Sequence, residues 1–184
     1  MNLFGWLKWK EKGAGTPLAQ WRTAWTAAIE GGSATDDELR RRLEALAPAE
    51  PDVEIELEMM DALEQLRTAQ QAAAAGALPT IETGHRVIGA ERCHFSAPAS
   101  LPADQVQAAG RVLLTGTRAV FVGGGRTAVC AWHAVHAVAR IERDLLLARA
   151  DGSAAAHYRF NNFADAVVSA FLAGQLKGAR RPSL

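Results

Sequence analysis

One stretch of this 184-residue sequence decides its fold: Gly110-Arg111-Val112-Leu113-Leu114-Thr115-Gly116-Thr117-Arg118-Ala119-Val120-Phe121-Val122-Gly123. Valine, leucine and phenylalanine crowd residues 110–116 and 118–123, and such runs between glycines favour β-strands. The glycines at 123–125 can adopt positive φ, so they predict a tight hairpin into a third strand at 126–132. This part of the chain is therefore expected to form a meander of strands.

Four further strands are expected, at 86–95, 137–142, 145–150 and 154–160. Asp151-Gly152 supplies the turn between the last two. Seven short strands at even spacing indicate a barrel or a sandwich rather than alternating β-α-β units.

A helix is expected after the last strand, because Asn161 or Asn162 can cap it and Gly178 can end it. Its apolar side is wide enough to close one end of a barrel. That side consists of Phe163, Val167, Ala170, Phe171 and Gly174.

Three helices are expected before the strands, within residues 17–80. Thr16 and Pro17 start the first, whose apolar stripe includes Trp21 and Trp25. Thr35 caps the second, with acidic residues in its first turn.

The third helix is expected to run for about 22 residues between Pro51 and Gly76. Its start alternates as a strand would, but the following residues have helical spacing and are good helix formers. The acidic residues of this segment are expected to form a solvated face. They are Glu54, Glu56, Glu58, Asp61 and Glu64.

The stretch from Gly110 to Gly123 resembles the core signature of bacterial PH-like and GRAM-like domains, in which Gly-x-Leu-x-Leu-Thr-x-x-Arg-Leu-x-Phe recurs. The likeness covers about 95 residues in all. It continues through Trp132, Val135–Ile141, Asp144–Leu147, Asp151-Gly152, Tyr158–Phe160 and the last helix. The resemblance implies a strongly bent seven-stranded antiparallel barrel with the helix across one end. It also implies that Arg118 pairs with Thr115 across the second hairpin.

The expected fold class is thus α+β: an N-terminal helical region, then a PH-like seven-stranded antiparallel β-barrel capped by a C-terminal helix. The expected boundaries are 1–16 for an aromatic and basic tip with a linker, 17–80 for the helical region, 83–178 for the barrel and 179–184 for a basic tail.

Charge is divided unevenly between the two parts. Residues 1–80 contain 8 Lys/Arg and 13 Asp/Glu, a net −5, and residues 81–184 carry the compensating +5. Either the halves attract each other, or the basic half meets an anionic surface, or the charge is ordinary solvated charge. Nucleic-acid binding is not expected, because the basic half has no clustered Lys/Arg stripe with exposed aromatics.

No catalytic, cofactor or metal site is expected. His133 and His136 would point to opposite faces of a strand, and no nearby Cys or carboxylate completes a zinc set. Cys93 and Cys130 belong to no CxxC pair and are expected to be buried thiols in a reducing compartment. Because no apolar run is long enough to span a bilayer and no signal peptide is recognised, we expect a cytoplasmic protein.

The first 12 residues form an aromatic and basic tip that could insert at an anionic membrane or bind a partner. It could equally fold back onto the protein or stay disordered. The candidate contact residues are Phe4, Trp6, Lys8, Trp9, Lys10 and, from the second half, Arg126.

Two functions are therefore expected. The first is a non-enzymatic binding or scaffolding module that engages a protein partner or a second copy through an edge strand or a groove beside the last helix. The alternative is a peripheral membrane module that binds anionic lipid through the tip. An enzyme with an unfamiliar site is the least favoured reading, since no titratable pair stands at a motif spacing.

Overall fold

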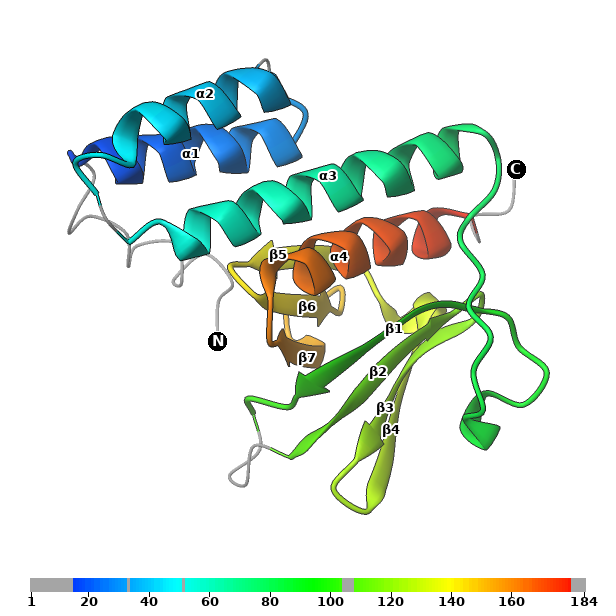
Figure 1. The fold of residues 1–184 in the computed structure, drawn as a ribbon. Coiled ribbons are helices and arrows are strands. Elements are labelled where there is room, and N and C mark those ends of the chain that lie inside the picture. The colour runs from blue at the N-terminus through cyan, green and yellow to red at the C-terminus, as the bar shows by residue number, and fades with distance from the viewer. Residues whose placement is uncertain (1–14, 33, 51, 104–107, 180–184) are drawn as a thin grey trace.

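The computed structural model describes residues 15–32, 34–50, 52–103 and 108–179. Its α+β fold has three N-terminal helices, seven antiparallel strands and a C-terminal helix (Figure 1). The helices are α1 (Pro17–Ile29), α2 (Asp36–Leu46), α3 (Glu54–Ala74) and α4 (Phe163–Gly178), with short 3₁₀ turns η2 (Arg86–Ile88) and η3 (Trp132–Ala134). The strands are β1 (Cys93–Ser100), β2 (Ala109–Thr115), β3 (Arg118–Gly123), β4 (Arg126–Ala131), β5 (Ala137–Ile141), β6 (Asp144–Ala148) and β7 (Ala154–Phe160).

The predicted starts of the helices are confirmed. The Thr16 side chain accepts a hydrogen bond from the Ala19 amide, and Thr35 accepts one from Glu38, so each caps its helix. Asn162 caps α4 by accepting from the Asp165 amide. The third segment is a helix of 21 residues, which settles the choice between helix and strand that its start left open.

The predicted α+β class, with seven antiparallel strands after the N-terminal helices and a C-terminal helix, is confirmed. The sheet has the order β4-β3-β2-β1-β7-β6-β5 and is not closed, because β4 and β5 are its two ends. Strand β1 pairs with β2 over seven residues but with β7 only at Ala99 and Ser100. The two halves of the sheet therefore bend about this short junction, and β4 and β5 remain edge strands.

The first strand begins later than predicted. Residues 86–88 form a 3₁₀ turn instead of a strand, and Gly89 ends it at a φ of 58°. This segment covers the outer face of the sheet, where Ile88 packs with Leu113 and Val120. Its apolar residues resembled a strand because they too are buried against the sheet. The first hairpin loop, predicted from residue 96, consequently begins after Ser100.

Tight turns follow the predicted chemistry. Gly124 and Gly125 have φ of 59° and 73°, which suits the β3–β4 hairpin, and Gly152 has a φ of 78° between β6 and β7. The predicted pairing of Thr115 with Arg118 is also present, since the Thr115 hydroxyl accepts from the Arg118 amide at 3.1 Å.

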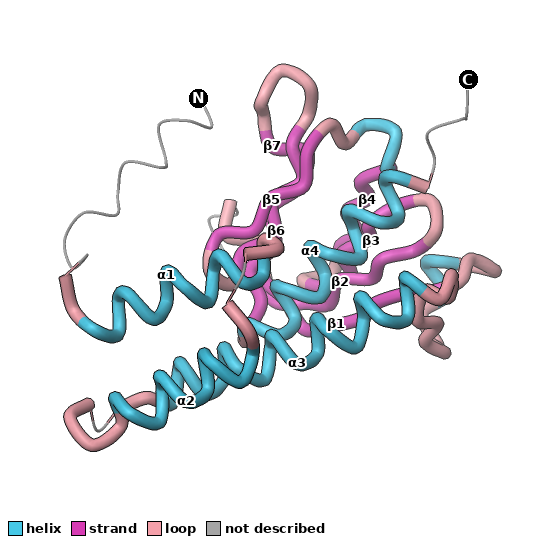
Figure 2. Tube along the Cα trace, turned by 90° about the horizontal axis from the view of Figure 1, so that it is seen from above, coloured by secondary structure: helices cyan, strands magenta, loops and turns pink. Residues whose placement is uncertain are grey.

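Helix α4 lies between the helical layer and the sheet (Figures 1 and 2). One side of it, with Ala164 and Val167, joins the core of α1, α2 and α3, in which Trp21 and Trp25 are fully buried. The other side, with Leu172 and Leu176, joins the core inside the bent sheet. The helical region and the sheet therefore share one helix and pack on each other.

Two glutamates of α3 were expected in a solvated face, and this expectation is wrong for both. The Glu56 side chain is buried and forms an ion pair with Arg22 of α1. The Glu58 carboxylate accepts from the Phe163 amide at 2.5 Å and from Arg143 at 2.6 Å, so it caps the start of α4. Glu54, Asp61 and Glu64 are exposed as expected.

Candidate binding groove

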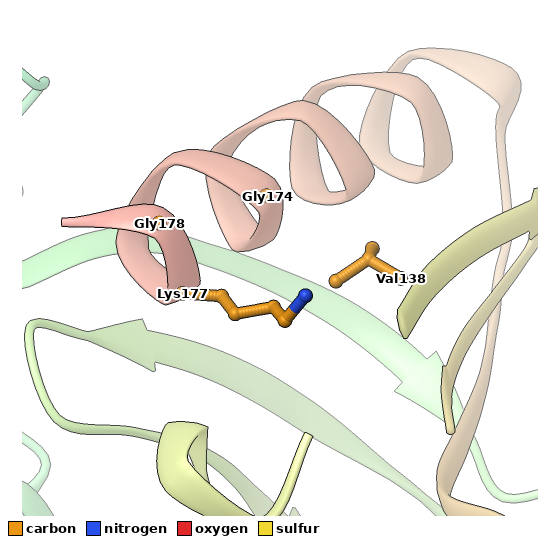
Figure 3. A pocket seen from close by; sticks show the side chains of 4 residues that line it. All are labelled: Val138, Gly174, Lys177 and Gly178. Atoms are coloured by element: carbon orange, nitrogen blue, oxygen red, sulfur yellow. The ribbon is translucent and has the colours of Figure 1, made fainter. Parts of the chain in front are cut away.

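A hollow of about 310 Å³ lies between the last turns of α4 and the edge strand β5 (Figure 3). Val138, Gly174, Lys177 and Gly178 line it. We refer to this hollow as the α4–β5 groove.

Two glycines make the helical wall of the groove. Gly174 and Gly178 are one turn apart, and a Cβ atom built on either would meet no heavy atom within 4 Å. Neither has positive φ, so the backbone does not require glycine at these positions. Glycine inside a helix costs about 1 kcal/mol relative to alanine. Gly174 therefore destabilises the helix relative to alanine, although neither its packing nor its backbone conformation requires glycine.

Strand β5 supplies the opposite wall. Among the described residues it pairs only with β6, so alternate residues direct their amide and carbonyl groups away from the sheet. Val138 packs partly against the core beneath α4. The far end of β5 is covered by the helical layer, because the guanidinium of Arg140 lies 5.1 Å from the ring centroid of Trp25. The accessible part of the edge is thus centred on Val138.

Lys177 is the charged residue in the lining of the groove. Figure 3 shows its amino group directed across the hollow toward Val138. The side chain is partly buried, and among the residues that the structure describes it forms no ion pair. The groove therefore presents a backbone edge, an apolar hollow and one cation.

Of the contact residues predicted from the sequence, Arg126 is the one that falls within the described residues. Phe4, Trp6, Lys8, Trp9 and Lys10 lie outside the described residues. Arg126 is exposed at the tip of the β3–β4 hairpin and does not line the groove.

The predicted burial of both thiols is confirmed. Cys93 and Cys130 are free and buried, and burial raises the pKa of each. His133 and His136 are both exposed on either side of Val135. Within the described ranges, no three His, Cys, Asp or Glu side chains are placed to hold a metal ion.

A polar cluster on β6 and β7 was missed by sequence reasoning. The buried Asp144 carboxylate lies 2.8 Å from His157 Nε2 and accepts two hydrogen bonds from Arg159. Burial raises the pKa of Asp144, but the hydrogen bonds and charges of its two partners outweigh burial and leave that pKa lowered. Asp144 and Arg159 are directly opposite in the strand register, so the cluster joins the two strands.

A second hollow of about 560 Å³ lies on the outer face of the sheet, between residues 81–85 and the side chains of Ser96 and Arg111. Arg111 donates to the Ser96 hydroxyl at 3.1 Å, and Glu82 lies in the same lining. Charges of both signs therefore line this hollow. The α4–β5 groove differs because its single charge accompanies a free strand edge and unoccupied space.

No protein-family model matches the chain, and no curated protein matches it. A proposal for its function therefore rests on the geometry of the structure. No helix among the described residues is long and apolar enough to cross a membrane. The groove could have been suspected from the sequence by one signal, the two glycines spaced four apart inside a segment that is otherwise helical.

Proposed function

We propose that this protein is a non-enzymatic binding module, in which a protein segment in extended conformation adds to the free edge of β5 and rests in the α4–β5 groove. The observation that carries the proposal is the empty space above Gly174 beside an edge strand. Strand addition supplies affinity through backbone hydrogen bonds and specificity through alternate side chains. The PH-like architecture suggested by the Gly110–Gly123 signature is part of this proposal.

The accessible edge is short, because Arg140 is already packed on Trp25. A ligand gains a few backbone hydrogen bonds and the burial of one or two side chains, each worth on the order of 1 kcal/mol. These contributions add up to about 5 kcal/mol, so we expect weak binding with a dissociation constant of about 0.1–1 mM.

The experiment is a selection of displayed random peptides on the full-length protein. We expect enriched sequences from the wild-type chain and none from Gly174→Leu, whose side chain fills the hollow. Val138→Lys should also abolish binding. Val129→Lys is the matched control, because Val129 is an exposed valine of the other edge strand, β4. Enrichment by Gly174→Leu equal to that of the wild type would refute the proposal.

The same variants separate the other functions expected from the sequence. If a second copy occupies the groove, light scattering will show a dimer that Gly174→Leu disrupts and Val129→Lys does not. If the protein instead sediments with anionic vesicles at low salt, and Trp6→Ala with Trp9→Ala abolishes this, the peripheral membrane function is supported in its place.

A further inference from the structure

Lys177 occupies the last turn of α4, where a cation interacts favourably with the helix dipole. That interaction does not require the side chain to enter the groove. Its amino group nevertheless extends across the hollow toward Val138, and no described carboxylate pairs with it (Figure 3). A partly buried ammonium that faces unoccupied space can donate hydrogen bonds to an acceptor on an incoming ligand.

The other wall residues carry no charge. Val138 is aliphatic, and Gly174 and Gly178 present only backbone. An incoming basic group would meet Lys177 with no acidic residue of the lining to offset the repulsion. An incoming carboxylate would gain a charge-assisted hydrogen bond.

Residues 1–12 and 179–184 are unsuited to the groove for the same reason. Residues 1–12 carry three lysines and one glutamate, and residues 179–184 carry two arginines and no acid. Both ends are basic, so Lys177 disfavours each of them. Charge complementarity points instead to an acidic segment of another protein.

The geometry points to a more specific ligand, and this inference rests on the proposed function. We propose that the bound segment is an extended acidic peptide, with an Asp or Glu that pairs with Lys177 and a compact apolar residue that fills the space over Gly174. Gly174, Lys177 and Val138 line the same hollow, so one bound segment can meet all three.

The test repeats the peptide selection on three forms of the full-length protein: wild type, Lys177→Arg and Lys177→Glu. Wild type and Lys177→Arg should enrich peptides that contain an Asp or Glu and a small apolar residue. Lys177→Glu should lose those sequences and enrich peptides with Lys or Arg in place of the acidic residue. Lys177→Arg keeps the charge and should therefore keep the preference. Enrichment of basic peptides by Lys177→Glu separates ligand recognition from a loss of helix stability, because an unfolded variant would enrich neither kind of peptide.

A defined probe makes the result quantitative. One enriched peptide and its Glu→Gln analogue are titrated into the wild-type protein, and the analogue should bind about tenfold more weakly, which corresponds to about 1.4 kcal/mol. Peptides that bind the groove with no preference for charge, and bind Lys177→Glu equally well, would overturn this inference and leave the proposed function standing. Absence of any enrichment by the wild type would overturn both.

Discussion

Replacing Gly174 by alanine should make the protein more stable while it obstructs the groove. Gly174 is inside α4, four residues before its end, and the added Cβ has no heavy atom within 4 Å. The substitution therefore introduces no clash, and alanine restricts the unfolded chain and favours the helix by up to about 1 kcal/mol. For a chain of this size, 1 kcal/mol raises the melting temperature by about 2–4 °C.

The assay is thermal unfolding followed by circular dichroism, with Gly110→Ala as the matched control. A Cβ at Gly110 would lie 2.4 Å from the Val122 carbonyl oxygen and 2.7 Å from the Gly123 Cα, both of which are backbone atoms. Backbone cannot move aside as a flexible side chain can, so Gly110→Ala should lower the melting temperature markedly. The same substitution should thus raise the melting temperature at Gly174 and lower it at Gly110.

A decrease in melting temperature for Gly174→Ala would refute this reasoning. It would mean that atoms of the chain occupy the space above Gly174 in solution, so the groove would be filled by the protein itself. Gly174→Leu extends the test, because a larger side chain should retain most of the helix stabilisation and still abolish peptide binding. Loss of both stability and binding in that variant would show that the hollow is needed for folding.

Three further predictions concern other parts of the fold. Glu58→Ala should lower the free energy of unfolding by about 1–2 kcal/mol, because it removes the cap at Phe163 and an ion pair. Urea unfolding measures this change, and an unchanged midpoint would contradict a stabilising role for the Glu58 contacts. Asp144→Asn should destabilise the protein at pH 7 by about 2 kcal/mol. The folded pKa of Asp144 is lowered, so its contribution is fully present above the unfolded pKa of about 3.9 and is lost as pH falls through the folded value. The denaturation curves of mutant and wild type should therefore begin to converge as pH falls below about 4 and should meet only below the folded pKa. Cys93 and Cys130 should react with Ellman's reagent at pH 8 only as fast as the protein opens. Burial both excludes the reagent and raises the pKa of each thiol. Immediate labelling in native buffer would show that the thiols are accessible.

Local patterns predicted most of this fold, because local physics decides helix caps and turns. Thr16, Thr35 and the 124–125 turn needed only their neighbours in sequence to be interpreted correctly. Whether the sheet closes could not be predicted from the local patterns, because closure depends on whether β4 and β5, at opposite ends of the sheet, pair with each other. The run at 86–95 was misread because burial against a sheet selects the same apolar residues as membership of it.

The side chains of the groove and the acidic residues of α3 were also not placed correctly by local sequence patterns. Glu56 and Glu58 were assigned to solvent because acidic residues on a helix usually are, whereas α1 and α4 supply an arginine and a free amide. Gly174 was assigned to the apolar face that fills the sheet, although it lines an unfilled hollow. In each case the partner is distant in sequence, so the local pattern contained no information about it.

The position of α4 also bears on how a ligand would bind. Because α4 is buried on one side by the helical layer and on the other by the sheet, neither layer can shift it without disturbing the other. Glu58 fixes its first turn, and Leu172 and Leu176 hold its later turns against the sheet. The distance between Gly174 and Val138 is therefore set before any ligand arrives, and a preformed site avoids the ordering cost that a flexible site incurs on binding. A short edge with few hydrogen bonds can support specific recognition only under that condition, so weakening the Glu58 contact should reduce peptide affinity even though Glu58 does not line the groove.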